Sequence, residues 1–261
     1  MPKFAANVSL MFNEHPVADR FSRAKQAGFA AVEYLHPYAN PATTVKQWLD
    51  DADVEMILLN TLVGNSEKGD CGLAAVPGRE SEFREHIEQA LEYATTCGAS
   101  MIHVMAGVVT EGTSRKAAEV KCIENLTMAA SLAKESGIRL LLEPLNTKDV
   151  PGYLHTTCSQ TKQIIKAVKR DNVLLQYDFY HRQIMEGNLA ELLKEHLDIV
   201  GHIQFSSLPG RHEPQHGEVN MAYLFDVIDE LGYIGWVGCE YTPKGETIEG
   251  LTWGQAFGLG I

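Results

Sequence analysis

A single (β/α)8 barrel is the fold class that this sequence predicts, and three observations point to it. The chain has 261 residues, close to the roughly 250 residues typical of one such barrel. Short β-type runs alternate with amphipathic segments that end in glycine, at the spacing of a βα unit. Neither a low-complexity tract nor a Pro/Ser linker interrupts this alternation. We therefore expect one domain that spans residues 1–261.

The expected elements follow one another in a regular order. Apolar runs of β type predict strands, and apolar residues at helical spacing, closed by Gly28, Gly98 or Gly137, predict helices. The expected strands cover residues 4–12, 30–35, 55–62, 101–107, 138–146, 173–180, 201–207 and 236–241. The expected helices cover residues 16–27, 43–51, 79–96, 115–136, 159–170, 188–197 and 220–231. The polar segment 64–72 is expected to be part of a long loop.

Composition narrows the class of protein. Hydrophobic residues make up 45% and charged residues 21%, which are ordinary globular values. The formal charge of −12 opposes binding to nucleic acid and to anionic membranes, so we expect neither as a partner. No apolar run reaches the roughly 20 residues that span a bilayer. Assembly into a homo-oligomer stays possible.

Cysteine use and the N-terminal segment indicate a cytoplasmic location. The five cysteines are odd in number, scattered, and without a CxxC pair, which argues against a disulfide framework and a zinc ribbon. Segment 1–16 has one lysine and a broken apolar run, which is a poor signal peptide. A reduced compartment fits both observations.

The last four expected strands each bring a polar side chain to the same end of the barrel. Glu143 follows LLL, Asp178 follows LLQY, Gln204 follows GHI, and Glu240 follows VGC. In this fold, functional residues come from the carboxyl ends of strands. Taken singly, each acid is equally well a helix N-cap or a surface acid. Four in register favour a shared site.

Three carboxylates and one amide oxygen at one barrel mouth form an oxygen-rich set of ligands. Hard cations such as Mg²⁺ or Mn²⁺ prefer such ligands. A bound cation would also supply the positive charge that an anionic substrate requires in an acidic protein. The sequence therefore predicts a Mg²⁺ or Mn²⁺ site.

Longer segments carry a resemblance to a known family. The segments are LLLEPLN, QYDFYH, HIQ, GRHEPQHGEVN and GWVGCEY, and the match runs from FAANVSLMF through PGRE to EYTPKGET. They resemble the hydroxypyruvate isomerase family, which includes 2-oxo-tetronate isomerases, within the xylose-isomerase-like barrels. The resemblance implies a metal held by Glu143, Asp178, Gln204 and Glu240, with Glu143 and Glu240 as the proton-transfer pair. Related sugar epimerases place a histidine where Gln204 stands, so the isomerase branch is favoured.

The expected reaction is an isomerisation of a small keto acid through an enediolate. Two adjacent substrate oxygens would chelate the cation, which acidifies the carbon-bound hydrogen. Glu143 and Glu240 would face each other across the substrate as base and acid, in an order that the sequence leaves open. The resemblance implies hydroxypyruvate and tartronate semialdehyde, or 2-oxo-tetronate and 3-oxo-tetronate, as the substrate pair. Segments MAGVV and RDNV resemble the second branch more closely.

Four further residues are candidates for substrate binding. Arg211 and His212 follow the seventh strand, and an arginine fork binds a carboxylate through two parallel hydrogen bonds. Arg79 in PGRE is the second choice for this role. His181 is expected to hydrogen-bond a substrate oxygen, as the resemblance supports. The structural alternatives are a solvated loop residue for Arg211, a helix N-terminal residue without a ligand role for Arg79, and a packed histidine for His181.

Further residues near the strand ends are expected to support the site or to pack against the rest of the fold. His202 shares strand parity with Gln204, so we expect it to point into the barrel behind the ligands. Glu33 and His36 close the second strand, where they line the pocket or act as caps. Cys239 alternates away from Glu240 and is expected to pack as a small apolar residue.

Three other functions stay open at this point. They are a ketose 3-epimerase, a metal-dependent endonuclease, and a sugar-acid binding protein without catalysis. The acidic charge disfavours the endonuclease, because DNA requires a basic face. Two opposed glutamates disfavour a pure binder, which has no need of proton carriers.

Overall fold

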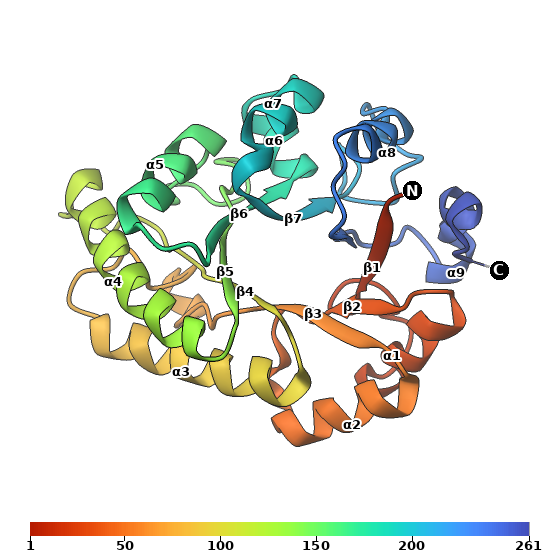
Figure 1. Ribbon diagram of the computed structural model, residues 1–261, viewed down its shortest axis with the longest axis horizontal. Coiled ribbons are helices and arrows are strands. Elements are labelled where there is room, and N and C mark those ends of the chain that lie inside the picture. The colour runs from red at the N-terminus through yellow and green to blue at the C-terminus, as the bar shows by residue number, and fades with distance from the viewer. Residues whose placement is uncertain (261) are drawn as a thin grey trace.

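Eight parallel strands close into a barrel within residues 1–260, the part of the chain that the computed structural model describes (Figure 1). Each strand pairs with its neighbour in sequence, and β1 also pairs with β8, which closes the sheet. The strands are β1 (Lys3–Asn7), β2 (Ala31–Glu33), β3 (Glu55–Asn60), β4 (Met101–His103), β5 (Arg139–Leu142), β6 (Val173–Asp178), β7 (Val200–Phe205) and β8 (Trp236–Cys239). The expected (β/α)8 fold is confirmed.

Helices surround the barrel and cover its outer face (Figure 1). The α-helices are α1 (Val17–Gln26), α2 (Ala42–Ala52), α3 (Glu80–Cys97), α4 (Arg115–Glu135), α5 (Cys158–Val168), α6 (Phe179–Met185), α7 (Leu189–His196), α8 (Met221–Glu230) and α9 (Thr247–Gly250). The 3₁₀ turns are η1 (Pro37–Ala39), η2 (Ser66–Lys68), η3 (Leu197–Ile199) and η4 (Leu251–Phe257). Local signals set their ends: Ser114 accepts a hydrogen bond from the backbone of Ala117 at the start of α4, and α3 stops where Gly98 adopts a φ of 78°. Across residues 1–260, none of the helices combines the length and the apolar character required to traverse a lipid bilayer.

Several strands are shorter than the sequence predicts. β1 ends at Asn7 rather than at residue 12, because the backbone then turns and the amide of Met11 donates to the carbonyl of Asn7. β4 likewise ends at His103. Most apolar residues beyond these ends are still buried, such as Met11, Phe12 and Val104, so burial does not mark where strand pairing stops.

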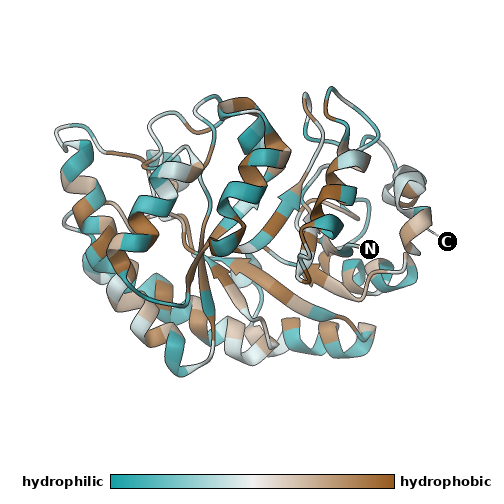
Figure 2. Cartoon of the chain, turned by 45° about the horizontal axis from the view of Figure 1, so that its top comes forward, coloured by the Kyte–Doolittle hydropathy of each residue, from teal (hydrophilic) through white to brown (hydrophobic). Residues whose placement is uncertain are grey.

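The barrel interior has an apolar layer and a polar layer two residues apart along the strands. Ala5, Ala31, Leu58, Met101 and Leu141 pack together as one apolar cluster. Because side chains of a strand alternate between its two faces, the residue two positions later points the same way. Those positions hold polar groups, namely Asn7, Glu33, Asn60, His103 and Glu143. Figure 2 shows the apolar strands inside a shell of helices with hydrophilic outer surfaces.

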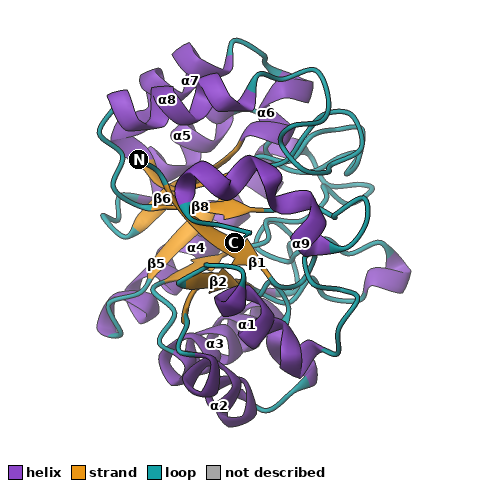
Figure 3. Ribbon diagram, turned by 90° about the vertical axis from the view of Figure 1, so that its right-hand side faces the viewer, coloured by secondary structure: helices purple, strands orange, loops and turns teal. Residues whose placement is uncertain are grey.

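Polar residues therefore gather at the carboxyl ends of the strands. The loops that leave these ends are longer than those at the opposite end, and they lie together on one side of the molecule (Figure 3). The loop after β3 continues to α3, and the loop after β7 continues to α8. This end of the barrel positions the candidate site.

Candidate active site

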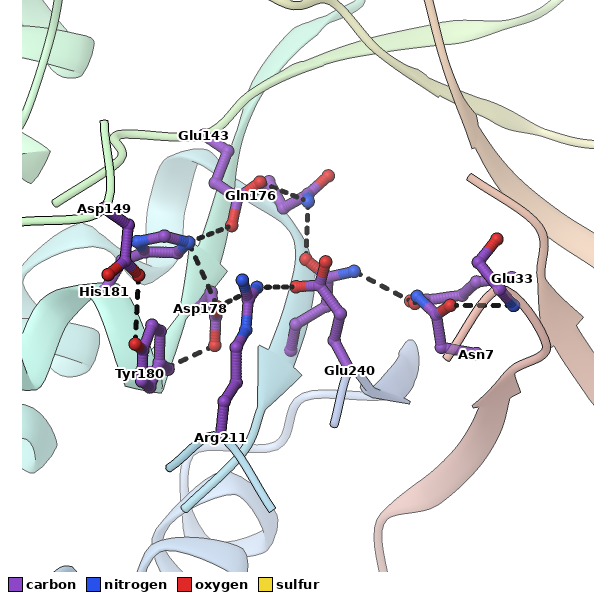
Figure 4. Close-up of polar contacts among 12 residues, drawn as sticks. Asn7, Glu33, Glu143, Asp149, Gln176, Asp178, Tyr180, His181, Arg211 and Glu240 are labelled. Atoms are coloured by element: carbon purple, nitrogen blue, oxygen red, sulfur yellow. Dashed lines mark hydrogen bonds and ion pairs between the residues drawn. The ribbon is translucent and has the colours of Figure 1, made fainter. Parts of the chain in front are cut away.

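Three carboxylates meet at the carboxyl end of the barrel. Glu143 follows β5, Asp178 ends β6, and Glu240 follows β8, and they are 4%, 0% and 7% exposed. The backbone amide of Glu240 donates to the carbonyl of Phe205, which holds the end of β8 against β7. The sequence-predicted acids thus occupy one buried cluster (Figure 4), which we call the acid cluster: Glu143, Asp178 and Glu240.

Arg211 places its guanidinium in this cluster. Its Nη2 lies 2.9 Å from Oε2 of Glu240 and 3.6 Å from Oδ2 of Asp178. The guanidinium also stacks over the ring of Tyr180, 4.8 Å from the ring centre. The backbone carbonyl of Arg211 accepts a hydrogen bond from Thr242, which ties the loop to the end of β8. One cation therefore faces several anions.

Burial and mutual repulsion shift the acidity of the cluster. Burial, and then the charges of Glu240 and Asp178, raise the pKa of Glu143 well above its usual range. Burial raises the pKa of Glu240 to about 8, although Arg211 acts in the opposite direction. Burial also raises the pKa of Asp178, against Arg211. Arg211 alone therefore does not compensate the charges of all three carboxylates near neutral pH.

His181 joins the acid cluster through one ring nitrogen. The backbone amide of Asn146 donates to its Nδ1 over 3.0 Å, so the neutral ring carries its proton on Nε2. That Nε2 lies 3.7 Å from both Glu143 and Asp178. Burial holds the pKa of His181 well below its usual range, which keeps the ring neutral. His181 is therefore built as a hydrogen-bond donor towards the mouth.

Amide side chains join Glu143 to the opposite side of the barrel. Nε2 of Gln176 donates to Oε2 of Glu143 over 3.0 Å and also to Oε1 of Gln204. Nε2 of Gln204 in turn donates to Oε2 of Glu33 over 2.9 Å. Gln204 therefore lies in the polar layer, beside the acid cluster and not within it. Figure 4 shows this row of contacts from Glu33 and Asn7 through Gln176 to Glu143.

Sequence reasoning missed Gln176 and His103. Gln176 lies two residues before Asp178 and shares its inward parity, a signal that the sequence contained. His103 ends β4 and places Nδ1 3.5 Å from Oε2 of Glu143. Burial lowers the pKa of His103 to about 3, so it is a neutral neighbour of the acid. Both residues line the inner wall beside Glu143.

The remaining predicted residues lie at different distances from the cluster. His202 is fully buried and its Nε2 lies 2.5 Å from Oε1 of Glu33, as its parity predicts. His212 contacts the backbone carbonyl of Thr242 through Nδ1, over 2.8 Å. Arg79 is paired with acids of its own loop and helix, Asp70 and Glu82, each at 2.7 Å. In residues 1–260, no ion pair links Arg79 or His212 to the acid cluster, and their roles in substrate binding stay predictions.

The donor set of this cluster fits a metal ion. Oε1 of Glu143 and Oδ2 of Asp178 are buried and accept no hydrogen bond from any described residue. Glu143, Asp178 and His181 each offer an atom within 4.8 Å of the others. Because Nε2 of His181 carries a proton, the carboxylate oxygens, and not this nitrogen, are the atoms that could bind a cation. An oxygen-rich set of this kind suits a hard cation.

Comparison with known proteins places the chain among isomerases. A model of the xylose isomerase-like TIM barrel family matches residues 21–257. The chain is 45% identical to 2-oxo-tetronate isomerase of Haemophilus influenzae, over 98% of this chain and 100% of that protein. It is 39% identical to hydroxypyruvate isomerase of Escherichia coli K12, over 97% of this chain and 98% of that protein. The crystal structure of AP endonuclease, family 2, from Brucella melitensis superposes with a TM-score of 0.96 at 44% identity, covering 98% of this chain and 99% of that one.

The family match over residues 21–257 spans the positions of the acid cluster. The resemblance expected from the sequence is confirmed. The chain therefore belongs to the hydroxypyruvate isomerase family, within the xylose isomerase-like TIM barrels, and is an enzyme of the isomerase class.

Proposed function

We propose that this enzyme isomerises a small sugar acid through an enediolate, with Mg²⁺ or Mn²⁺ as its cofactor and in the cytoplasm. The substrate pair is 2-oxo-tetronate and 3-oxo-tetronate, or hydroxypyruvate and tartronate semialdehyde. The names of the two isomerase relatives support these substrates. The sequence segments noted above favour the four-carbon pair.

The observation that carries this proposal is the pair of buried glutamates beside Asp178. Glu143 and Glu240 follow β5 and β8, and the charge of Glu240 contributes to the raised pKa of Glu143. A glutamate with a raised pKa is able to hold and release a proton near neutral pH. Two such groups in one pocket suit a reaction that moves a hydrogen between neighbouring carbons.

The same pocket offers ligands for the cation. Glu143, Asp178, Gln204 and Glu240 would hold it, as the resemblance implies, and the buried oxygens without donors support that assignment. Bound there, the cation would polarise the substrate's adjacent carbonyl and hydroxyl oxygens and acidify the carbon-bound hydrogen. This set of cation ligands is the same whichever of the two glutamates first acts as the base.

The protein groups then share the proton transfers and the binding of the substrate. One glutamate removes the hydrogen from the hydroxyl-bearing carbon, which leaves an enediolate. The other glutamate delivers a proton to the neighbouring carbon, and the hydroxyl proton passes to the former carbonyl oxygen, so that carbonyl and hydroxyl exchange places and no atom is gained or lost. Nε2 of His181 donates a hydrogen bond to a substrate oxygen, where charge develops during the reaction. Arg211 binds the substrate carboxylate, with His212 and Arg79 as further candidates.

The decisive experiment is a panel of three- to six-carbon keto acids and ketoses assayed with Mg²⁺ or Mn²⁺. Product formation and exchange of the carbon-bound hydrogen with deuterated solvent are both measured. We expect exchange and turnover with a three- or four-carbon keto acid, and much less with neutral ketoses. Exchange with a ketose alone would indicate the epimerase instead.

Two controls separate the other open functions. A duplex with an abasic site tests endonuclease activity, which we expect to be undetectable because the chain carries a formal charge of −12. Binding of a keto acid without any hydrogen exchange would indicate a binding protein. Exchange with none of the keto acids overturns the proposed function.

A further inference from the structure

We propose that Glu33 is a positioning residue that turns the amide oxygen of Gln204 towards the metal-binding side of the barrel. This inference rests on the proposed function, because it assigns Gln204 as a ligand of the cation. The inference goes beyond the proposed function because it gives Glu33, the buried acid on β2, an effect on metal binding. Among the described residues, the hydrogen-bond partners of Glu33 lie outside the acid cluster.

Glu33 is buried and surrounded by donors. Its side chain is 0% exposed. Oε2 accepts from Nδ2 of Asn7 over 2.8 Å and from Nε2 of Gln204 over 2.9 Å, while Oε1 lies 2.5 Å from Nε2 of His202. A buried carboxylate is stable only when its oxygens are satisfied in this way. Its place at the centre of these donors is therefore well defined.

Gly238 provides the space that Glu33 occupies. A Cβ atom at this position of β8 would lie 1.9 Å from Oε1 of Glu33, far inside van der Waals contact. The backbone of Gly238 is not in the left-handed region, so its lack of a side chain, and not its conformational freedom, is what the site uses. A larger residue here would displace the carboxylate.

The row of contacts gives the amide of Gln204 a single orientation. A carboxylate only accepts hydrogen bonds, so the group of Gln204 that faces Glu33 is its NH2. Its oxygen must then point the other way, where it accepts from Nε2 of Gln176. The same nitrogen of Gln176 donates to Glu143, so both of its hydrogens are used. Carboxylates at both ends thus fix the direction of every donor between them.

The orientation matters because a cation binds an amide through its oxygen only. With Glu33 in place, Gln204 presents an oxygen towards Gln176 and Glu143. With Glu33 replaced by Gln, position 33 presents one oxygen and one NH2 group, and where that NH2 group faces Gln204, the amide of Gln204 turns its oxygen towards it. The side that faces the cation would then carry NH2. Groups that orient a metal ligand typically change metal affinity by about 10- to 100-fold when replaced.

The test is Mn²⁺ affinity, measured by calorimetry and by electron paramagnetic resonance on the full chain. We expect Glu33→Gln to weaken Mn²⁺ binding by about tenfold or more. Glu135→Gln is the matched control, because Glu135 is exposed at the end of α4, and we expect it to bind Mn²⁺ as the natural sequence does. Equal affinity of Glu33→Gln and the natural sequence overturns the proposal.

A double-mutant cycle separates orientation from simple loss of charge. A carboxylate at position 204 presents an oxygen on both sides, so it needs no orientation. Glu33→Gln should therefore cost far less Mn²⁺ affinity in the Gln204→Glu background than in the natural sequence. An equal loss in both backgrounds means that only charge matters, and it overturns the proposal.

A second variant covers the case in which Glu33→Gln does not fold. Gly238→Ala keeps every charge but pushes the carboxylate of Glu33 from its place, so we expect it also to weaken Mn²⁺ binding. Circular dichroism and melting temperature establish that it is folded. Unchanged affinity in folded Gly238→Ala overturns the positioning role. If the natural sequence itself binds neither Mn²⁺ nor Mg²⁺, the proposed function fails instead, which is a distinct result.

Discussion

The guanidinium of Arg211 pairs with Glu240 at 2.9 Å, the same carboxylate that the proposed reaction uses for proton transfer. Arg211 also lies 3.6 Å from Asp178. Its side chain is 31% exposed, whereas these acids are buried, so it reaches the cluster from the solvent side. It therefore competes for carboxylate oxygens that a bound cation would use, and it stands where an anionic substrate would enter.

Replacement of Arg211 should therefore have opposite effects on cation and substrate. We expect Arg211→Ala to bind Mn²⁺ at least as tightly as the natural sequence, because an opposing positive charge is removed. The KM for the keto acid should rise by about 10- to 100-fold, since a charge-assisted hydrogen bond contributes about 1.5–3 kcal/mol. Calorimetry with Mn²⁺ and steady-state kinetics measure the two effects. A KM that stays unchanged contradicts the assignment of Arg211 to the substrate carboxylate.

Glu143 and Glu240 should each be required for turnover but not for holding the ligand. We expect Glu143→Gln and Glu240→Gln to lower kcat by about 10²- to 10⁴-fold, the usual contribution of a positioned acid or base. Binding of the keto acid, followed by calorimetry at saturating Mg²⁺, should persist. Hydrogen exchange retained by one of the two variants would identify the residue that starts the reaction. Full activity of either variant contradicts the proton-transfer pair.

His181 should affect catalysis without holding the metal. Its Nδ1 accepts from the amide of Asn146, so Nε2 acts as a donor. We expect His181→Ala to lower kcat by about tenfold or more while Mn²⁺ affinity stays within a few-fold, because the lost interaction is a hydrogen bond. Kinetics and Mn²⁺ titration on the same preparation distinguish the two roles. A large loss of Mn²⁺ affinity would instead make Nε2 a ligand.

The metal-free protein should lose stability as the pH rises from 6.5 to 8. The pKa of Glu240 is raised from 4.5 to about 8, so the folded state keeps a proton that the unfolded state has released. The free energy of unfolding therefore falls as pH increases through this window. Buried His103, whose pKa is lowered to about 3, acts in the opposite direction but only below about pH 6.5.

Urea unfolding in the presence of EDTA measures this dependence. Glu240→Gln has no carboxyl proton at position 240, so its free energy of unfolding should fall less between pH 6.5 and 8 than that of the natural sequence. Added Mn²⁺ should stabilise the natural sequence more at pH 8 than at pH 6.5, since the carboxylates are then ionised. Parallel curves for the two proteins would show that Glu240 does not titrate in this range.

The fold and the acids at the strand ends were predictable because both follow from periodic patterns. Glu143 and Asp178 interrupt apolar runs at the end where this fold collects functional groups. The ends of the strands were harder to predict. Phe12 is buried although it lies beyond β1, and α6 begins at Phe179 with residues that continue the apolar pattern of β6. Hydropathy records burial, and in these two places burial does not distinguish strand from turn or helix.

The contacts among the polar residues were not predictable from one sequence. The sequence is compatible with Glu33 as a pocket residue or as a cap, and only the fold brings it to Gln204, 171 positions away. Arg79 has the right chemistry for a carboxylate, yet the structure provides Asp70 and Glu82 as its partners. Such choices depend on distances across the barrel, which a pattern of residue types does not contain.

The apolar and the polar layer lie two residues apart on the same face of each strand, so a change in strand register moves both layers together. Insertion or deletion of a single residue within β5 would shift its register by one position, so that Leu141 and Glu143 would both turn from the barrel interior to the outer face. A change in a loop that follows a strand end does not shift the register of the strand itself. Redesign of substrate range is therefore best directed at loop residues that do not contact the acid cluster, with Arg211 kept because it pairs with Glu240 and Asp178.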